Sequence, residues 1–74
     1  MTQHFQLRGE YITLGQLIKA IGLIQTGGEI KAFLASHEVQ VNGEREERRG
    51  RKLRAGDTVI IPGTGPVQIV EPEH

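Results

Sequence analysis

The sequence contains no cysteine and no tryptophan, and its only aromatic residues are Phe5, Tyr11 and Phe33. Without cysteine, the chain has neither a disulfide framework nor a thiolate metal site. With so few aromatic residues, its core must consist mainly of Ile, Leu and Val. The apolar stretches are too short to cross a membrane, and residues 1–10 lack the apolar run of a signal peptide. These absences predict a small cytoplasmic protein that has no membrane partner.

Positive charge is concentrated in one part of a chain that is neutral as a whole. Nine Lys and Arg balance nine Asp and Glu among the 74 residues. Six of the nine basic residues nevertheless fall within ten positions: Arg45, Arg48, Arg49, Arg51, Lys52 and Arg54. Arginine suits phosphate groups and can stack on bases, and a local field attracts a polyanion even at zero net charge. Such a run also occurs in solvated loops, so composition alone leaves both interpretations open.

The first helix is predicted directly after Thr13. Thr13 and Gln16 have the spacing of a capping box, in which each side chain bonds the other residue's backbone N–H. The apolar residues that follow occur at the i, i+3, i+4 and i+7 spacing of a helical stripe: Leu14, Leu17, Ile18 and Ile21. Gly22 is the expected end, because glycine adopts the left-handed conformation that closes helices.

A second helix is predicted to begin at Thr26 and to finish near residues 36–37. Thr26 and Glu29 again have capping-box spacing, and the apolar face consists of Ile30, Phe33 and Leu34. Gly27 and Gly28 lie in its first turn, where each costs about 1 kcal/mol of helix stability relative to Ala. That cost suggests close approach by a phosphate or by a packed neighbouring segment, and the sequence does not distinguish these.

The remainder of the chain has the pattern of strands. Residues 39–41 alternate, Asn42-Gly43 indicates a tight hairpin turn, and residues 44–47 form the expected return strand. Further strands are predicted at residues 58–61 and 67–70. The fold class is therefore α+β, with two short helices packed on a small, mostly antiparallel sheet. Residues 1–10 are interpreted as a lead-in, 11–70 as one domain and 71–74 as a frayed tail.

Three groups of residues are candidates for binding. The first is the basic run, with Arg48, Arg49, Arg51 and Lys52 as the expected contacts. The sequence leaves open whether Arg45 and Arg54 contact the ligand or pair internally, and the nearby glutamates are expected to pair with some arginines across the hairpin. The second group is Thr26, Gly27 and Gly28, where free N–H groups attract anions. The third is Lys31, on the border of the second helix.

The sequence offers no arrangement of catalytic or metal-binding residues. His4, His37 and His74 are scattered and lack the spacing of metal ligands. Ser36 is the sole serine and is not part of a nucleophile elbow. Glu46 and Glu47 would point to opposite faces of a strand, which makes them a poor acid/base pair. We therefore expect no enzymatic activity, no cofactor, no metal and no small-molecule substrate.

Residues 11–70 resemble a known RNA-binding family in the order and spacing of their motifs. The pattern is two helices, a V-x-V-N-G hairpin and a later G-D turn before a strand, supplied here by Val39, Val41, Asn42, Gly43, Gly56 and Asp57. It is similar to the αL-type domain first defined in ribosomal protein four of the small subunit, and TGGEIK and RRGRKL look like the stand-alone YaaA/YbcJ-like members.

The resemblance implies non-catalytic binding of structured RNA, ribosomal or transfer RNA, through a face formed by the second helix and the hairpin region. It places Thr26, Gly27, Gly28, Lys31 and the arginines from Arg48 onward on that face. Many members carry Ser-Arg where Thr26-Gly27 stand here, so this chain lacks an arginine at the helix start. The few aromatic residues favour a folded RNA over a single strand. An adaptor that meets an acidic protein through its arginines is the alternative function.

Overall fold

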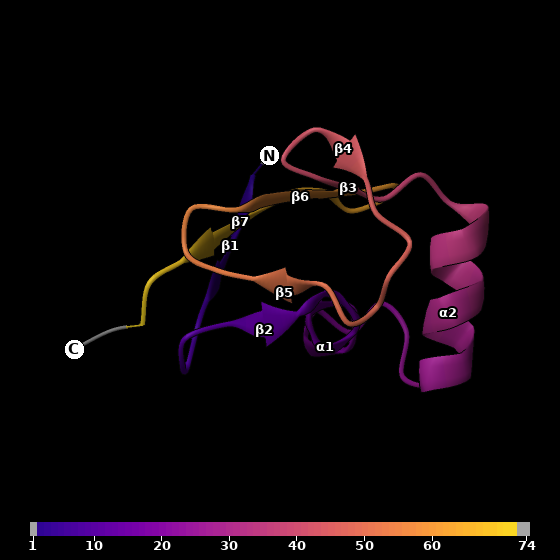
Figure 1. Cartoon of the computed structure of the whole chain (residues 1–74), viewed down its shortest axis with the longest axis horizontal. Coiled ribbons are helices and arrows are strands. Elements are labelled where there is room, and N and C mark those ends of the chain that lie inside the picture. Colours follow the sequence, from indigo (N-terminus) through magenta and orange to yellow (C-terminus); the bar gives the residue numbers. More distant parts are fainter. Residues whose placement is uncertain (1, 73–74) are drawn as a thin grey trace.

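The computed structural model describes residues 2–72 and has the predicted α+β architecture. Its elements follow one another as β1 (Gln3–Gln6), β2 (Ile12–Thr13), α1 (Leu14–Ala20), α2 (Gly27–Ser36), β3 (Gln40–Val41), β4 (Glu44–Arg45), β5 (Lys52–Leu53), β6 (Thr58–Ile61) and β7 (Gly65–Val70). Figure 1 shows α2 standing at one end of the molecule, while α1 lies beside the short β2–β5 pair. Neither helix in this part of the chain has the length and apolar character needed to cross a bilayer.

Both helices begin where the capping residues predict. Thr13 Oγ1 accepts a hydrogen bond from the Gln16 N–H at 3.3 Å, and Gln16 Oε1 accepts one from the Thr13 N–H at 3.1 Å. At α2, Thr26 Oγ1 accepts from the Glu29 N–H at 3.3 Å, but the reciprocal bond is absent from the described structure. The first capping box is therefore complete and the second is half formed. Gly22, with φ of 79°, follows α1 as predicted.

The main sheet has five strands in the order β1-β7-β6-β3-β4. Its pairs are antiparallel except for β1 and β7, which are parallel. The strand β1 lies within the predicted lead-in, so residues 3–6 are part of the fold. Phe5 is paired with Ile69 and packs against the core, and the Leu7 N–H donates to the Val70 carbonyl at 3.0 Å. An edge strand with one large apolar residue gives little sequence signal. Of the predicted tail, residues 73–74 lie outside the described residues.

A second, two-stranded sheet joins β2 to β5, with Ile12 opposite Leu53 and Thr13 opposite Lys52. This sheet was not predicted, because two-residue strands are too short to show an alternating pattern. Leu53 is fully buried, whereas Lys52 is exposed. The buried side chain of Leu53 thereby attaches the part of the basic run around Lys52 and Arg54 to the core.

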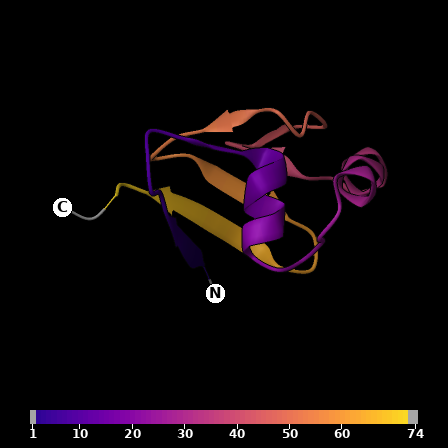
Figure 2. The same ribbon diagram turned by 90° about the horizontal axis from the view of Figure 1, so that it is seen from below.

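The core lies between the main sheet and the helices. In Figure 2, α1 lies in front of the strands of the main sheet, and α2 is seen nearly end-on at its side. Thirteen apolar residues form this core: Leu7, Leu14, Leu17, Ile18, Ile30, Leu34, Val39, Val41, Leu53, Val59, Ile61, Val67 and Ile69. All are aliphatic, as the composition predicts. On β6, Val59 and Ile61 face the core, so Ile60 points to the opposite, uncovered face of the sheet.

The predicted return strand at residues 44–47 is shorter than expected and ends at Arg45. The β3–β4 register continues for one more hydrogen bond after Arg45. The Glu46 N–H donates to the Val39 carbonyl at 2.9 Å, and the Glu46 side chain turns toward Arg48 and Arg51. The segment that bears the arginines therefore begins at Glu46, directly after β4.

Candidate nucleic-acid interface

The backbone of the basic run is hydrogen-bonded to the first turn of α1. The Leu14 N–H donates to the Arg51 carbonyl and the Gly15 N–H donates to the Arg49 carbonyl, each at 2.8 Å. A methyl group on Gly15 would lie 3.2 Å from Arg49 Cβ and 3.3 Å from its carbonyl oxygen, so the segment sits directly on this glycine. The protein backbone thus occupies N–H groups that a helix start otherwise leaves free. The arginines project from an anchored segment.

Glu46 is the charged partner that organises two of these arginines. Its two carboxylate oxygens accept hydrogen bonds from Arg48 Nε and Nη2, each at 3.0 Å, which is a bidentate pair. Oε1 also accepts from Arg51 Nη1 at 3.3 Å, and Oε2 accepts from the Arg48 backbone N–H at 3.1 Å. A glutamate does pair with arginines, but Glu46 pairs with Arg48 and Arg51 of its own segment and not across the hairpin as expected.

The pKa of Glu46 reflects these bonds. The side-chain hydrogen bond from Arg48, supported by the Arg48 N–H and by Arg51, lowers this pKa from 4.5 to about 2, although burial opposes the shift. The same pair raises the pKa of Arg48. The Glu46 side chain is only 10% exposed, whereas the Arg48 side chain is 75% exposed. Glu46 therefore fixes the orientation of the Arg48 guanidinium and leaves the remaining N–H groups of Arg48 facing solvent.

Four cations surround a hollow on one side of Gly50. We call it the arginine hollow, and its lining residues are Arg48, Gly50, Arg51, Lys52, Arg54 and Asp57. Three of the predicted contacts are therefore brought together. The sequence left the role of Arg54 open, and the structure places this residue on the hollow. Its backbone N–H donates to Asp57 Oδ2 at 2.8 Å, and its carbonyl accepts from the Asp57 N–H at 3.0 Å. Arg45 instead pairs with Glu47 at 3.2 Å.

A second hollow, which Gly50 also borders, lies between the starts of the two helices. We call it the helix-start hollow, and it is lined by Thr13, Gly15, Gln16, Lys19, Gly27, Ile30, Arg49 and Gly50. Arg49 reaches across it, and its Nη1 donates to the Gly27 carbonyl at 3.1 Å. Arg49 is thereby separated from the other three predicted contacts, Arg48, Arg51 and Lys52. Lys19, which the sequence analysis did not select, also borders this hollow.

The two glycines at the start of α2 have different surroundings. A methyl group on Gly27 would lie 3.0 Å from Arg49 Nη1, whereas one on Gly28 would meet no atom within 4 Å. Gly27 thus lies against the end of the Arg49 side chain, which a methyl group there would displace. Gly28 remains open to solvent.

Lys31 lies on the exposed side of α2, one turn beyond Gly27. Its side chain forms no hydrogen bond or ion pair within residues 2–72. The structure therefore leaves its amino group exposed to solvent, and Lys31 is not among the residues that line the helix-start hollow.

The two motifs that mark the family pattern are bonded to each other. Asn42 Nδ2 donates to Asp57 Oδ1 at 2.9 Å, and Asn42 Oδ1 accepts from the Thr58 N–H at 2.9 Å. Asn42 and Gly43 have φ of 53° and 86°, which a tight hairpin turn requires. Asp57 also bonds the Arg54 N–H. The Asn-Gly turn and the Gly-Asp turn thus close both ends of the loop that carries the arginines.

Tyr11 is a further residue that the sequence analysis did not place in the site. Lys52 Nζ lies over its ring at 5.0 Å from the centroid, and Arg54 Cζ lies over it at 5.9 Å. These are cation–π distances. The contact depends on the β2–β5 register, which the sequence does not reveal.

Other reactive side chains are dispersed in the part of the chain that the structure covers. Residues 2–72 contain no cluster of three His, Asp or Glu residues that could hold a metal ion. The His37 ring stacks on Phe33 with centroids 4.2 Å apart, and His37 Nδ1 lies 2.9 Å from Ser36 Oγ. These two polar residues are engaged at the end of α2.

Comparison with protein families matches residues 5–70 to the S4 domain. The chain belongs to the S4 domain family. A relative from Bacillus subtilis (strain 168), named probable ribosome maturation protein RlbA, is 50% identical over 70 residues, which cover 95% of this chain and 99% of the relative. The resemblance drawn from the helices and hairpin motifs is thus confirmed. S4 domains are non-catalytic RNA-binding modules, and this chain is one of them.

Proposed function

We propose that this S4 domain binds structured RNA through a basic face composed of the arginine hollow, the helix-start hollow and Lys31. The observation that carries the proposal is the placement of Arg48, Arg51, Lys52 and Arg54 around one hollow on a segment bonded to α1. Double-stranded RNA is recognised by its shape and through phosphate and 2′-OH contacts, for which exposed Arg and Lys suffice. Arg49, Thr26, Gly27 and Gly28 form the adjoining part of the face.

The RNA is proposed to be ribosomal, and the site of action the cytoplasm. Support comes from the Bacillus subtilis relative, whose name describes a probable ribosome maturation protein and which matches this chain along nearly its whole length. Transfer RNA is the other folded RNA to which the same chemistry applies. The proposed role is binding during ribosome maturation, without a chemical step.

The test measures the affinity of a fluorescent RNA hairpin of about 16 base pairs over a range of salt concentrations. Each phosphate neutralised by the protein contributes a salt slope of about −0.9 on logarithmic axes. The test variant replaces Arg48, Arg49, Arg51 and Lys52 with Ala and also carries Glu46→Gln, so that no carboxylate is left buried without a partner. We expect this variant to bind at least about tenfold more weakly and with a smaller slope.

Glu46→Gln alone is the matched control, because it retains every cation. Circular dichroism and thermal unfolding establish that both variants are folded. Unchanged affinity in the folded test variant would contradict the proposed face. A protein partner that is still captured by the wild-type chain after nuclease treatment, together with weak, salt-insensitive RNA binding, would support the adaptor function instead.

A further inference from the structure

Tyr11 presents an aromatic ring at the edge of the basic face. It is 43% exposed and is the single tyrosine of the sequence. It directly precedes β2, and the antiparallel register that pairs Thr13 with Lys52 places Tyr11 across from Arg54. Tyr11, Lys52 and Arg54 therefore share the outer face of the small sheet, opposite the buried Leu53. The ring lies where the charged face ends.

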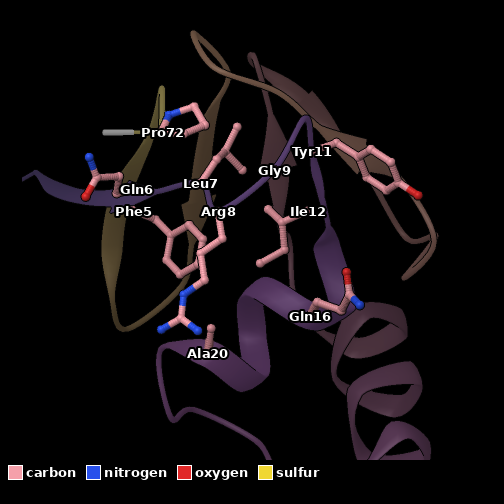
Figure 3. A pocket seen from close by; sticks show the side chains of 10 residues that line it. All are labelled: Phe5, Gln6, Leu7, Arg8, Gly9, Tyr11, Ile12, Gln16, Ala20 and Pro72. Atoms are coloured by element: carbon pink, nitrogen blue, oxygen red, sulfur yellow. The ribbon is translucent and has the colours of Figure 1, made fainter. Parts of the chain in front are cut away.

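On its other side, Tyr11 borders a groove of about 960 Å³. This is the size of pocket that accepts small ligands. Figure 3 shows Arg8 extending along the groove toward Ala20, with Tyr11 at the opposite rim and Ile12 between them. The apolar walls come from Phe5, Leu7 and Ile12, and the polar groups come from Gln6, Arg8 and Gln16. None of the residues selected from the sequence lies in this groove.

The polar groups of the groove retain hydrogen-bonding capacity. Gln16 uses Oε1 to cap α1, which leaves its NH₂ group as a donor. The Arg8 guanidinium has no hydrogen bond or ion pair with another residue in the described range 2–72. The groove therefore combines an exposed ring, apolar walls and two unused donors.

A nucleobase matches this combination. Tyrosine stacks on unpaired bases, and amide and guanidinium donors bond the carbonyl and ring-nitrogen acceptors at base edges. The groove lies next to the arginine hollow, because Lys52 and Arg54 of that hollow lie over the Tyr11 ring that borders the groove. A phosphate backbone that follows these two cations would bring the next base to Tyr11.

We propose that an unpaired nucleotide of the bound RNA leaves the stem beside the arginine hollow and places its base in this groove against Tyr11. This inference rests on the proposed function, since the stem must first occupy the basic face. It adds a structural feature to the ligand: a stem with a bulged or flanking unpaired nucleotide next to the helical part.

The first experiment uses fluorotyrosine in the full chain, which gives one fluorine NMR signal because the sequence has one tyrosine. The probes are a blunt RNA hairpin, the same hairpin with a single bulged adenosine, and the same bulge with the base removed. We expect the bulged adenosine to shift the fluorine signal strongly and the baseless bulge to shift it much less. Equal shifts with all three probes would overturn the inference.

The second experiment compares affinities for the bulged and baseless probes. Stacking of one base is worth roughly a fivefold or larger gain in affinity. We expect this preference in the wild type and in Tyr11→Phe, which retains the ring, and its loss in Tyr11→Ala. Ile60→Thr is the matched control, since Ile60 is 40% exposed on the uncovered sheet face and should leave the preference intact.

The outcomes separate the inference from the proposed function. A preference that persists in Tyr11→Ala, or is absent from the wild type, overturns the nucleotide site while salt-dependent binding of the blunt hairpin upholds the basic face. Failure of every hairpin to bind in a salt-dependent manner overturns both. A preference that is lost in Tyr11→Ala and kept in Tyr11→Phe supports both.

Discussion

The two hollows beside Gly50 hold their cations in different ways. In the arginine hollow, Arg48 and Arg51 are fixed by the carboxylate of Glu46, while Lys52 and Arg54 lie over Tyr11. In the helix-start hollow, Arg49 is bonded to a backbone carbonyl, and the adjacent space depends on glycine. The first hollow is a dense, preorganised set of charges, and the second is defined by close packing. We expect the first to supply most of the affinity for RNA and the second to determine the fit.

This difference also shows that a run of basic residues overstates the charge available to a ligand. The four cations of the arginine hollow face two carboxylates, those of Glu46 and Asp57. Carboxylates that orient arginines reduce the local charge, but they limit the side-chain entropy that is lost when a phosphate binds. Lys52 and Arg54 lack an ion pair in the described structure and so retain their full attraction for phosphate.

The largest effect is expected from removing charge from one hollow at a time. Replacing Lys52 and Arg54 with Gln should weaken binding of an RNA hairpin roughly 50-fold near 0.1 M salt and reduce the salt slope by about two. The matched variant, with Lys19 and Lys31 replaced by Gln, removes the same charge near the helix starts and should cost less than about tenfold. Fluorescence anisotropy at several salt concentrations measures both. Equal losses would remove the distinction between the hollows.

A second prediction concerns the anchor that the hollows share. Gly15→Ala places a methyl group against the backbone of Arg49, which has little room to move, and should lower the free energy of unfolding by about 1–3 kcal/mol. In a domain of this size each 1 kcal/mol corresponds to roughly 4–8 °C in Tm. Gly28→Ala adds a methyl group in open space and is the matched control. A Gly15→Ala variant with unchanged Tm would mean that the segment is not held on α1.

The third prediction is a pH dependence that comes from Glu46. Because its pKa of about 2 in the folded chain lies below the ordinary value of 4.5, the ionised carboxylate stabilises the fold above about pH 5. This stabilisation is lost as the pH falls from about 5 to about 2. Glu46→Gln should remove that part of the profile and cost on the order of 1 kcal/mol near neutral pH, since its partner Arg48 is largely exposed.

Urea unfolding at about pH 7 and about pH 3 measures this effect. Glu47→Gln is the control, because the Arg45–Glu47 pair lies at the surface and should contribute little. If the Glu46→Gln variant and the wild type lose the same stability on acidification, the ion pair does not organise the segment.

The smallest effects are expected from the glycines of α2. Gly28→Ala should raise the free energy of unfolding by up to about 1 kcal/mol, because alanine favours the helix. Gly27→Ala gains similar helix propensity, but its methyl group displaces the Arg49 guanidinium and removes the bond to the Gly27 carbonyl. We therefore expect Gly27→Ala to weaken RNA binding a few fold with little change in Tm. Identical RNA affinities for Gly27→Ala and the wild type would exclude Arg49 from the interface.

The parts of the fold that could be predicted are those with a repeated pattern. Both helices follow from apolar periodicity and from Thr13 and Thr26 as N-caps, and the hairpin turn follows from Asn42-Gly43. The strands β1, β2 and β5 could not be predicted, because short polar strands at an edge depend on what lies beside them. The pairing of these strands depends on tertiary contacts. Because β1 pairs with β7, residues 3–6 of the predicted lead-in belong to the main sheet.

The composition of the sequence predicted which segment carries the candidate site, but it did not predict how the side chains of that segment are arranged. The run of arginines marked the segment, and nearby glutamates indicated that some of the charge would be neutralised. Which glutamate turns inward depends on where β4 ends, and the sequence alone does not specify this. Tyr11 and Arg54 join the site only through the β2–β5 register. Tyr11, which is distant from the arginines in the sequence, thus completes a proposed basic face whose central arginines the sequence had predicted.

The most direct test of the basic face is a titration of the isotopically labelled chain with an RNA hairpin, followed through its backbone amide NMR signals. The account predicts that the largest shifts cluster at residues 48–54, with a second group at residues 15–19 and 27–31. Amide shifts confined to the uncovered sheet face, at Gln40, Ile60 and Gln68, would contradict it.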